Sequence, residues 1–233
     1  MIKKPQLFTP GPVTVPPEVL AATAEPIVHH RAPEFDPIFK KVSEDLKYVF
    51  QTSNPVVTFA SSGTGAMEAS VVNFHSPGDE MIVIEGGKFG ERWAEIGRAY
   101  GLTVHTIAVE WGQAASPQTV REALKAHPNA KSVYATLVET STGTMTDVAA
   151  IAPVVKEHGA LFIVDAVSAL GAEVLKTDEW KIDVVVTGSQ KALMLPPGLA
   201  FAALSGAAGE RMKTANGPSY YVCFEKALKN LEE

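Results

Sequence analysis

The sequence has little of several features that would place it in a specialised class of protein. It contains one cysteine, Cys223, which excludes an internal disulfide framework and is compatible with a reducing cytoplasm. It has no lysine- or arginine-rich run, and its formal net charge of −6 argues against nucleic acid or an anionic membrane as the main partner. The most apolar stretch, residues 160–172, is short and contains Asp165, so it does not span a bilayer. Prolines near the N-terminus prevent the apolar core of a signal peptide. We therefore expect a soluble, cytoplasmic protein without a membrane partner.

What the chain does contain is a regular alternation of strand-like and helix-like segments. Its 233 residues fit one large domain or two small ones, and we find no linker that would divide them. Prolines in residues 1–17 predict an extended N-terminal arm, followed by a short helix over 18–24 and an amphipathic helix over 33–51. Strands are expected at 56–60, 81–85, 102–109, 132–138, 161–167, 182–186 and 198–205, with helices at 67–74, 90–100, 117–126 and 147–158. Repeated βαβ units indicate an α/β fold with a mostly parallel sheet and helices on both faces.

The most informative stretch, residues 182–200, delivers a lysine just after a buried strand. Polar residues from Thr187 to Gln190 end the apolar run, and Lys191 follows with the apolar residues 192–195 beside it. An apolar, partly dry setting disfavours the ammonium form of a lysine, and a neutral amine is a nucleophile toward a carbonyl carbon. The alternative is an ordinary surface lysine on the first turn after a strand. The other loops must decide between the two.

Ligands of such sheets bind beyond the carboxyl ends of the strands, so we compared the loops at that edge. Residues 61–65 are small or hydroxylated and lead into a helix, which predicts either a phosphate-binding turn or a serine-rich helix cap. Asp165 ends the most apolar strand and needs a cation or several hydrogen-bond donors, unless it only caps the next turn. Residues 139–143 present hydroxyl groups, and Phe89 in the loop 86–93 offers either a flat aromatic face or a core side chain.

A phosphate-binding turn, a buried carboxylate, an aromatic face, hydroxyl donors and a carbonyl-seeking lysine are together used by one cofactor, pyridoxal 5′-phosphate. The segments that carry these features also resemble a known family. The resemblance rests on SSGTGAMEAS, GGKFGERW, ETSTG, VDAVSALGA and GSQKALMLPPG, and it begins at TPGPV near the N-terminus. These motifs are similar to those of class V aminotransferases of the alanine-glyoxylate and serine-pyruvate type, in particular the branch that includes the small subunit of soluble hydrogenases.

The resemblance implies a fold type I large domain that binds pyridoxal phosphate over residues 18–233. Lys191 would form the internal aldimine and Asp165 would pair with the pyridine nitrogen. The remaining residues have supporting roles implied in the same way: Ser62, Gly63, Thr64 and Gln190 at the phosphate, Phe89 and Val167 on the two ring faces, Thr140 at the cofactor edge, and Gly11 and Arg31 on the substrate side. The implied reaction moves an amino group between alanine, serine or aspartate and glyoxylate or pyruvate, in a homodimer whose active site lies near the subunit interface.

The resemblance also implies a C-terminal small domain, with the arginine that binds the substrate carboxylate, and we expect this domain to be missing from the chain. That expectation leaves a non-catalytic cofactor-binding or dimerisation domain as one alternative. A second alternative is a NAD-dependent oxidoreductase, because Gly63 and Gly65 open a helix and Glu85 ends the next strand, although Glu68 replaces the third glycine of that fingerprint. The sequence His29-His30-Arg31 is expected to be solvated or at an interface, since it lacks a second pair of metal ligands.

Overall fold

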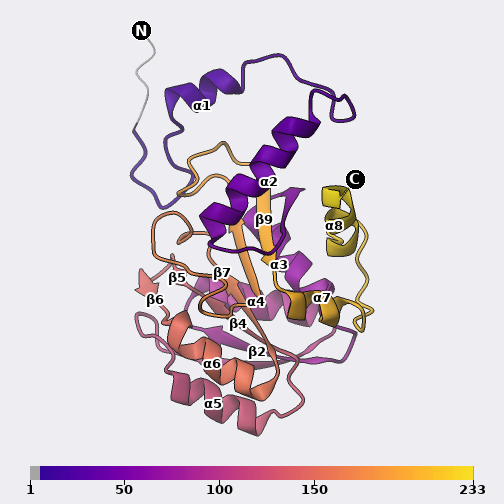
Figure 1. Cartoon of the computed structure of the whole chain (residues 1–233). Coiled ribbons are helices and arrows are strands. Elements are labelled where there is room, and N and C mark those ends of the chain that lie inside the picture. The colour runs from indigo at the N-terminus through magenta and orange to yellow at the C-terminus, as the bar shows by residue number, and fades with distance from the viewer. Residues whose placement is uncertain (1–5, 233) are drawn as a thin grey trace.

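The computed structural model describes residues 6–232, so Met1 to Pro5 of the expected arm and Glu233 lie outside the described residues. Its centre is a seven-stranded sheet with the order β1-β9-β8-β7-β4-β2-β3 (Figure 1). The strands of this sheet are β1 (Val56–Ala60), β2 (Glu80–Glu85), β3 (Thr103–Ala108), β4 (Ser132–Thr136), β7 (Leu161–Asp165), β8 (Val184–Gly188) and β9 (Leu199–Leu204). A small hairpin of β5 (Val138–Glu139) and β6 (Thr144–Met145) lies apart from the sheet.

The strand pairing confirms the expected mostly parallel sheet. The pairs β3/β2, β2/β4, β4/β7 and β7/β8 are parallel, whereas β9 runs antiparallel to both of its neighbours, β8 and β1. Strands β4, β7 and β8 are buried along their whole length, which explains their nearly continuous apolar sequences. The carboxyl ends of the parallel strands therefore meet at one edge of a buried sheet.

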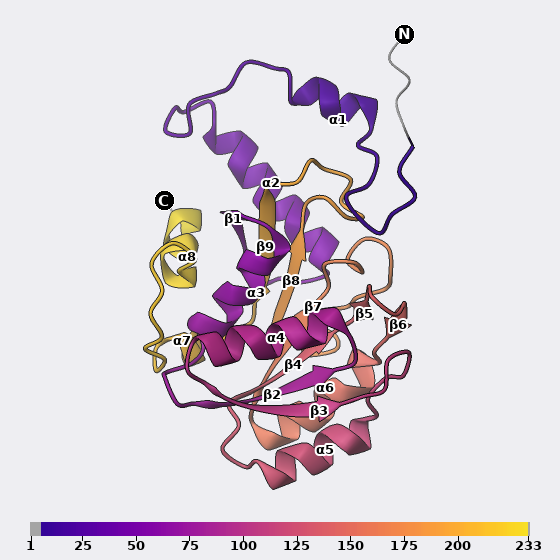
Figure 2. The same cartoon turned by 180° about the vertical axis from the view of Figure 1, so that it is seen from behind.

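Helices cover both faces of the sheet, as the alternation predicted. The helices are α1 (Pro17–Ala22), α2 (Asp36–Phe50), α3 (Gly63–Val72), α4 (Lys88–Ala99), α5 (Pro117–Ala126), α6 (Val148–His158), α7 (Gly206–Met212) and α8 (Phe224–Glu232). Helices α2, α5 and α6 pack against one face and share a core with residues such as Ile82 and Phe162. Helices α3, α4, α7 and α8 cover the other face, where Trp93 and Phe224 are fully buried (Figure 2). Two cores thus hold the sheet between two helical layers.

Some expected boundaries are wrong at the edge where the loops meet. The helix expected over 67–74 begins at Gly63 and ends at Val72, because Ser62 takes the extended backbone of an N-cap and places the glycine-containing turn inside the helix. Strand β8 continues through Gly188, since Thr187 and Gly188 still pair with β9. The polar residues that were expected to end the strand therefore lie partly within it.

The N-terminal region differs from the rest of the molecule because it projects beyond the sheet. Residues 6–16 form no helix or strand, and α1 and the first half of α2 extend past the layered part (Figure 1). Of the apolar side chains on α2, Leu46 and Phe50 are buried, whereas Ile38 and Val42 are exposed. Among the described residues, no helix combines the length and the apolar composition needed to cross a membrane.

Candidate active site

Lys191 and Asp165 reach the same edge of the sheet from adjacent strands. Asp165 is the last residue of β7 and pairs in register with Val186 of β8. Strand β8 ends at Gly188, and Lys191 follows in the turn that leads toward β9. Because β7 and β8 are parallel, both side chains emerge from their carboxyl ends. The two residues that the sequence singled out thus come from neighbouring positions in the fold.

The turn that carries Lys191 is covered by the N-terminal arm. The Val13 amide donates to the Gln190 carbonyl oxygen (3.1 Å), and the Lys191 amine lies 3.5 Å from the Gly11 carbonyl oxygen. A Cβ atom at Gly11 would lie 2.0 Å from the Cδ of Lys191, so this close approach requires glycine. Lys191 is only 9% exposed. Burial lowers the pKa of the Lys191 amine, and the charge of Asp165 offsets part of that shift.

Asp165 is buried with few hydrogen-bond donors. It is 2% exposed, and its Oδ1 accepts a hydrogen bond from the Val167 amide at 2.7 Å, which is the turn-capping role considered from the sequence. No described residue donates a hydrogen bond to the other oxygen, Oδ2. Burial raises the pKa of Asp165 to about 6, the Val167 hydrogen bond lowers it, and the charge of Glu139 raises it further. Asp165 is therefore a buried carboxyl group that a cationic ligand would stabilise.

The first turn of α3 lies beside this pair, and its Gly65 amide already donates to the Ser62 carbonyl oxygen at 2.8 Å. Ser62 is the N-cap of α3, but its side chain makes no capping hydrogen bond, which argues against the simple cap interpretation. A Cβ atom on Gly63 would lie 2.8 Å from Val167 Cγ2, and one on Gly188 would lie 3.3 Å from the Gly63 nitrogen. The side-chain oxygen of Gln190 is buried there without a hydrogen-bond partner among the described residues. Glycines thus bring these backbones together around unpaired polar atoms.

Phe89 and Thr64 are joined by a residue to which the sequence analysis gave no role. The Arg92 guanidinium lies over the Phe89 ring, 4.7 Å from its centroid, and its Nη1 donates to Thr64 Oγ1 at 3.0 Å. Phe89 is half-buried and belongs to α4, so it is neither a core residue nor fully exposed. Arg92 adds a positive charge between the expected aromatic face and the expected phosphate turn. It lies within the GGKFGERW segment, which was the available signal.

Thr140 belongs to a second group of polar side chains at this edge. Its Oγ1 lies 2.6 Å from Ser168 Oγ, and Ser168 follows Asp165 by three residues. Glu139 is buried and organises the neighbouring loop, because its carboxylate accepts from the amides of Phe89 (3.0 Å) and Gly90 (3.1 Å) and from the Ser141 hydroxyl (2.7 Å). Glu139 and Ser168 were quoted only as parts of motifs, and their contacts could not be read from the sequence.

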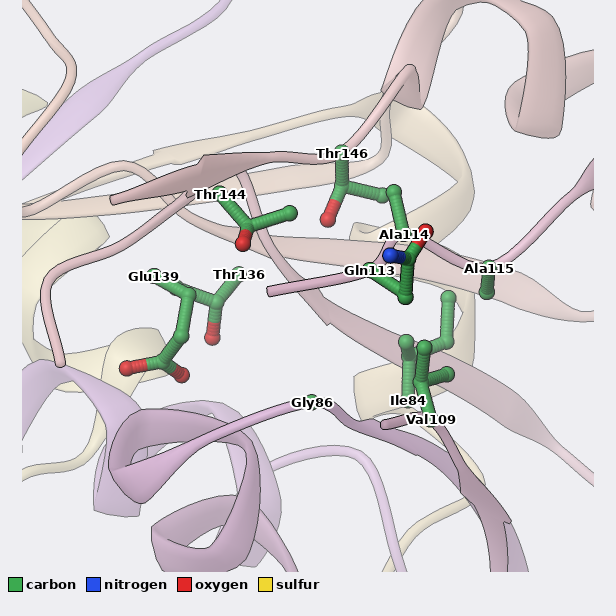
Figure 3. A pocket seen from close by; sticks show the side chains of 10 residues that line it. All are labelled: Ile84, Gly86, Val109, Gln113, Ala114, Ala115, Thr136, Glu139, Thr144 and Thr146. Atoms are coloured by element: carbon green, nitrogen blue, oxygen red, sulfur yellow. The ribbon is translucent and has the colours of Figure 1, made fainter. Parts of the chain in front are cut away.

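A narrow pocket adjoins this group without including the lysine. Figure 3 shows it between Gly86 on one side and Thr144 and Thr146 on the other, with Glu139 and Thr136 at one end. The hydroxyl oxygen of Thr136 is buried and has no hydrogen-bond partner among the described residues. Neither Lys191 nor Asp165 lines the pocket. We therefore place the candidate reacting groups at the end of β7 and β8, beside this pocket and not within it.

Arg31 lies apart from this group of residues, and the sheet order excludes the dinucleotide motif. Arg31 is exposed, hydrogen-bonds through its backbone amide to His29, and makes no side-chain contact with the residues above in the described part of the chain. The dinucleotide alternative is contradicted by the sheet order, because four strands separate β1, which precedes α3, from β2, which ends at Glu85. A ribose-binding acid in that motif belongs at the neighbouring strand, which Glu85 does not occupy.

Pyridoxal 5′-phosphate, the cofactor of the family that the motifs resemble, has three groups that need partners, namely an aldehyde carbon, a phosphate and a pyridine nitrogen. The residues described above fit all three. Lys191 supplies a buried amine, the N-terminus of α3 has no side-chain cap and lies beside Gln190, and Asp165 has an oxygen without a donor. In the described structure, Asp165 Oδ2 and the side-chain oxygen of Gln190 have no protein partner, as expected at a site that binds another group.

Comparisons with known proteins identify the family of the chain. The family model for class-V aminotransferases matches residues 7–227. The chain is 47% identical over 232 residues to the 42 kDa subunit of soluble hydrogenase from Anabaena cylindrica, covering 98% of this chain and 61% of that protein. It is 37% identical to L-aspartate–glyoxylate aminotransferase from Paracoccus denitrificans, covering 94% of this chain and 56% of the relative.

A solved structure shows the same fold. The alanine–glyoxylate aminotransferase of Nostoc sp. superimposes with a TM-score of 0.94 at 31% identity, covering 99% of this chain and 62% of that one. The predicted fold type I architecture is thereby confirmed, over a chain that spans about three-fifths of the length of these relatives. The chain belongs to the class-V aminotransferase family.

Proposed function

We propose that this chain is the cofactor-binding large domain of a pyridoxal-phosphate-dependent aminotransferase, with Lys191 as the residue that holds the cofactor covalently. The observation that carries the proposal is the meeting of Lys191 and Asp165 at the carboxyl ends of β7 and β8, both buried and both short of partners. A structural lysine would be paired with a carboxylate or exposed. In the described structure, the only hydrogen bond of the Lys191 amine is the long contact to Gly11.

The side chains have separable roles in this proposal. When bound, the cofactor acts as an electron sink for the bond-breaking step at the substrate Cα. Asp165 would hold a proton on the pyridine nitrogen, and the N-terminus of α3 with Ser62, Gly63, Thr64 and Gln190 would bind the phosphate. Once the amine of the donor has displaced it, the Lys191 amine, whose pKa is lowered by burial, would accept the proton from the substrate Cα. Phe89 and Val167 would hold the two faces of the ring, and Thr140 with Ser168 would lie at its edge.

The substrates proposed are a small amino acid and a small 2-oxo acid. Alanine, serine or aspartate would be the donor and glyoxylate or pyruvate the acceptor, a choice supported by relatives named for alanine–glyoxylate and aspartate–glyoxylate transfer. The arm at Gly11 lies against Lys191 and limits the space beside it, which favours short side chains. Arg31 remains a proposed contact for the substrate from outside the crevice.

The proposed partner is a second copy of the chain. Large apolar side chains are exposed on the projecting N-terminal region, including Phe8, Ile27, Ile38 and Val42. Exposed apolar side chains that gather in one region of a protein are typical of an interface. Size measurement by light scattering tests the homodimer.

Borohydride reduction tests the attachment to Lys191. The protein is loaded with pyridoxal 5′-phosphate, reduced and digested, and the modified peptide is identified by mass spectrometry. We expect the modification on the peptide that contains Lys191, and none in Lys191→Ala. Lys88→Ala is the matched control, because Lys88 lies on the adjacent α4 but is exposed and paired with Glu91. Modification that persists in Lys191→Ala would contradict the proposal.

A second experiment asks how much of the reaction this chain performs. Single-turnover conversion by alanine, serine and aspartate is compared between residues 1–233 and a chain extended to the full length of its relatives. We expect cofactor binding in both and faster conversion in the longer one, because positioning of the substrate carboxylate contributes about 7 to 11 kcal/mol at most. Equal rates would show that this chain suffices. Binding without any turnover in either would favour a non-catalytic cofactor domain.

A further inference from the structure

Three side chains that could bind a metal ion lie together toward the amino ends of the strands, away from the candidate active site at their carboxyl ends. Glu80 is the first residue of β2, His105 lies in the middle of β3, and His127 is the C-cap of α5. Strand β2 runs six residues from Glu80 to Glu85, so the cluster lies about 16 Å from the edge that carries the loops. The aminotransferase proposal uses none of these three residues.

The contacts within the cluster are short. The Nε2 of His105 lies 2.9 Å from Oε2 of Glu80, and the rings of His105 and His127 stack with centroids 3.5 Å apart and planes 12° apart. One donor atom from each residue lies within 4.8 Å of the other two, and the side chains of Glu80 and His105 are about one-quarter exposed. No other such group of three occurs among the residues that the structure describes.

We propose that Glu80, His105 and His127 bind a divalent transition-metal ion, with Zn²⁺ as the best match. Two imidazole nitrogens and one carboxylate oxygen are ligands that Zn²⁺ accepts, and water would complete a tetrahedral set. Ligand atoms of such a site are separated by about 3.4 Å, given metal–ligand distances near 2.0 to 2.1 Å. The pair of Glu80 and His105 is already close to that separation, and His127 must tilt out of the stack so that its nitrogen reaches the ion.

The position of the cluster gives the ion a structural role. Strand β3 is the last strand of the sheet, and it is hydrogen-bonded only to β2 among the described strands. A metal bound to β2, β3 and the end of α5 would fix this edge strand to its neighbour and to the helix that covers it. Edge strands are weak points of sheets, so a tie at this place stabilises the fold without contact to the active site.

Zinc affinity and thermal stability test the proposal on the purified protein. After treatment with a chelator and dialysis, Zn²⁺ is titrated in competition with a chromogenic chelator. We expect one bound ion and an increase of about 5 to 10 °C in Tm when Zn²⁺ is at a hundred times its Kd. His127→Ala and Glu80→Gln should each lower the affinity at least about tenfold. Glu80→Gln is the safer variant for folding, because glutamine can keep a hydrogen bond to His105.

The matched control is the double variant His29→Ala/His30→Ala. These two histidines are also stacked, with centroids 4.7 Å apart, but they are exposed and belong to no group of three possible ligands in the described chain. The control should bind Zn²⁺ as the unmodified protein does. The proposal is wrong if Zn²⁺ binds equally to Glu80→Gln, His127→Ala and the unmodified protein, if the control loses the binding instead, or if the unmodified protein shows neither binding nor a change in Tm.

Discussion

A buried aspartate lies at each end of the strands of the central sheet, at the carboxyl edge and at the amino edge. The two aspartates differ in the number of hydrogen bonds that they accept. Asp165 at the carboxyl end of β7 and Asp183 just before β8 are both 2% exposed. Asp183 accepts hydrogen bonds from the Lys156 amine (2.6 Å), the Phe162 amide (2.9 Å) and the Ser205 hydroxyl (2.9 Å). Asp165 accepts one, from the amide of Val167. The two aspartates are therefore equally buried, but the protein supplies three hydrogen bonds to Asp183 and one to Asp165.

Other groups follow the same division. At the amino edge, the buried His75 ring contacts the Val71 carbonyl oxygen at 3.0 Å and Ser132 Oγ at 2.7 Å. At the carboxyl edge, the Gln190 oxygen has no partner among the described residues and the α3 N-terminus has no side-chain cap. A buried polar atom without a partner costs about 1 to 3 kcal/mol. The buried polar groups named at the amino edge thus stabilise the fold, whereas Asp165 Oδ2 and the Gln190 oxygen at the carboxyl edge stay free for a ligand at the expense of stability.

The largest effect is expected from Asp183→Asn in the cofactor-free protein. The substitution removes the charge that pairs with Lys156 and turns an amide group toward donors that need an acceptor. We expect the free energy of unfolding to fall by about 3 kcal/mol, measured by urea denaturation. Ser205→Ala, which removes one donor and leaves the carboxylate, should cost less. A decrease of less than about 1 kcal/mol in the free energy of unfolding of Asp183→Asn would show that Asp183 does not stabilise the fold in this way.

A decrease of similar size in the free energy of unfolding is expected when acid protonates His75. Burial lowers the pKa of His75 to about 4, so the unfolded chain binds this proton more readily than the folded protein does. Stability from neutral His75 is therefore complete above pH 6.5 and is lost as the pH falls toward 4, by about 3 kcal/mol at most. His75→Gln should show a flatter decline over this range in parallel denaturation series. Identical pH profiles would contradict the assignment.

Asp165→Asn should have the opposite effect on stability, because it should raise the free energy of unfolding at neutral pH. Because the pKa of Asp165 in the folded protein is about 6, the folded state binds its proton more tightly, and stability decreases as the pH rises from about 4 to 6. In the cofactor-free protein above pH 7, asparagine should therefore raise the free energy of unfolding by about 2 kcal/mol, with no gain at pH 4. Comparing Tm at these two pH values checks the sign.

Asp165→Asn also tests the role of the Asp165 charge when the cofactor is present. Asparagine keeps the hydrogen bond from Val167 but has no charge for the pyridine nitrogen, so we expect half-transamination to slow more than cofactor binding weakens. Spectroscopic titration and single-turnover rates separate the two quantities. A near-normal half-reaction in Asp165→Asn would remove its proposed role.

The smallest effect is expected from Gln190→Leu. Leucine removes the unpaired oxygen, which should raise the stability of the cofactor-free protein by about 1 kcal/mol. It also removes the amide nitrogen that would donate to the phosphate, which should lower cofactor affinity about tenfold. Gln118→Leu on α5 is the control, since Gln118 is exposed and contacts Glu122. Unchanged cofactor affinity in Gln190→Leu would show that this oxygen does not face the ligand.

Much of the candidate site could be predicted from the sequence, because its parts are local. The alternating pattern placed the strands and helices, and the rule that ligands bind beyond the strand ends then selected the loops that contain Lys191, Asp165 and Ser62. Helix boundaries failed where backbone geometry overrode composition, as at Gly63, whose small size allows α3 to start against Val167.

The sequence by itself thus determined the alternation of elements, the apolar runs that become buried strands, and the motifs at their ends, because each depends on residues close together in the chain. Only the tertiary structure decided which strands are neighbours, and so separated Glu85 from the α3 turn. It also decided that Asp183 receives Lys156 and Ser205 while Asp165 receives neither, and that Arg92 reaches Thr64. These are contacts between residues from about twenty to thirty positions apart in the chain, and packing of the whole sheet and its helices fixes them where local pattern carries no information.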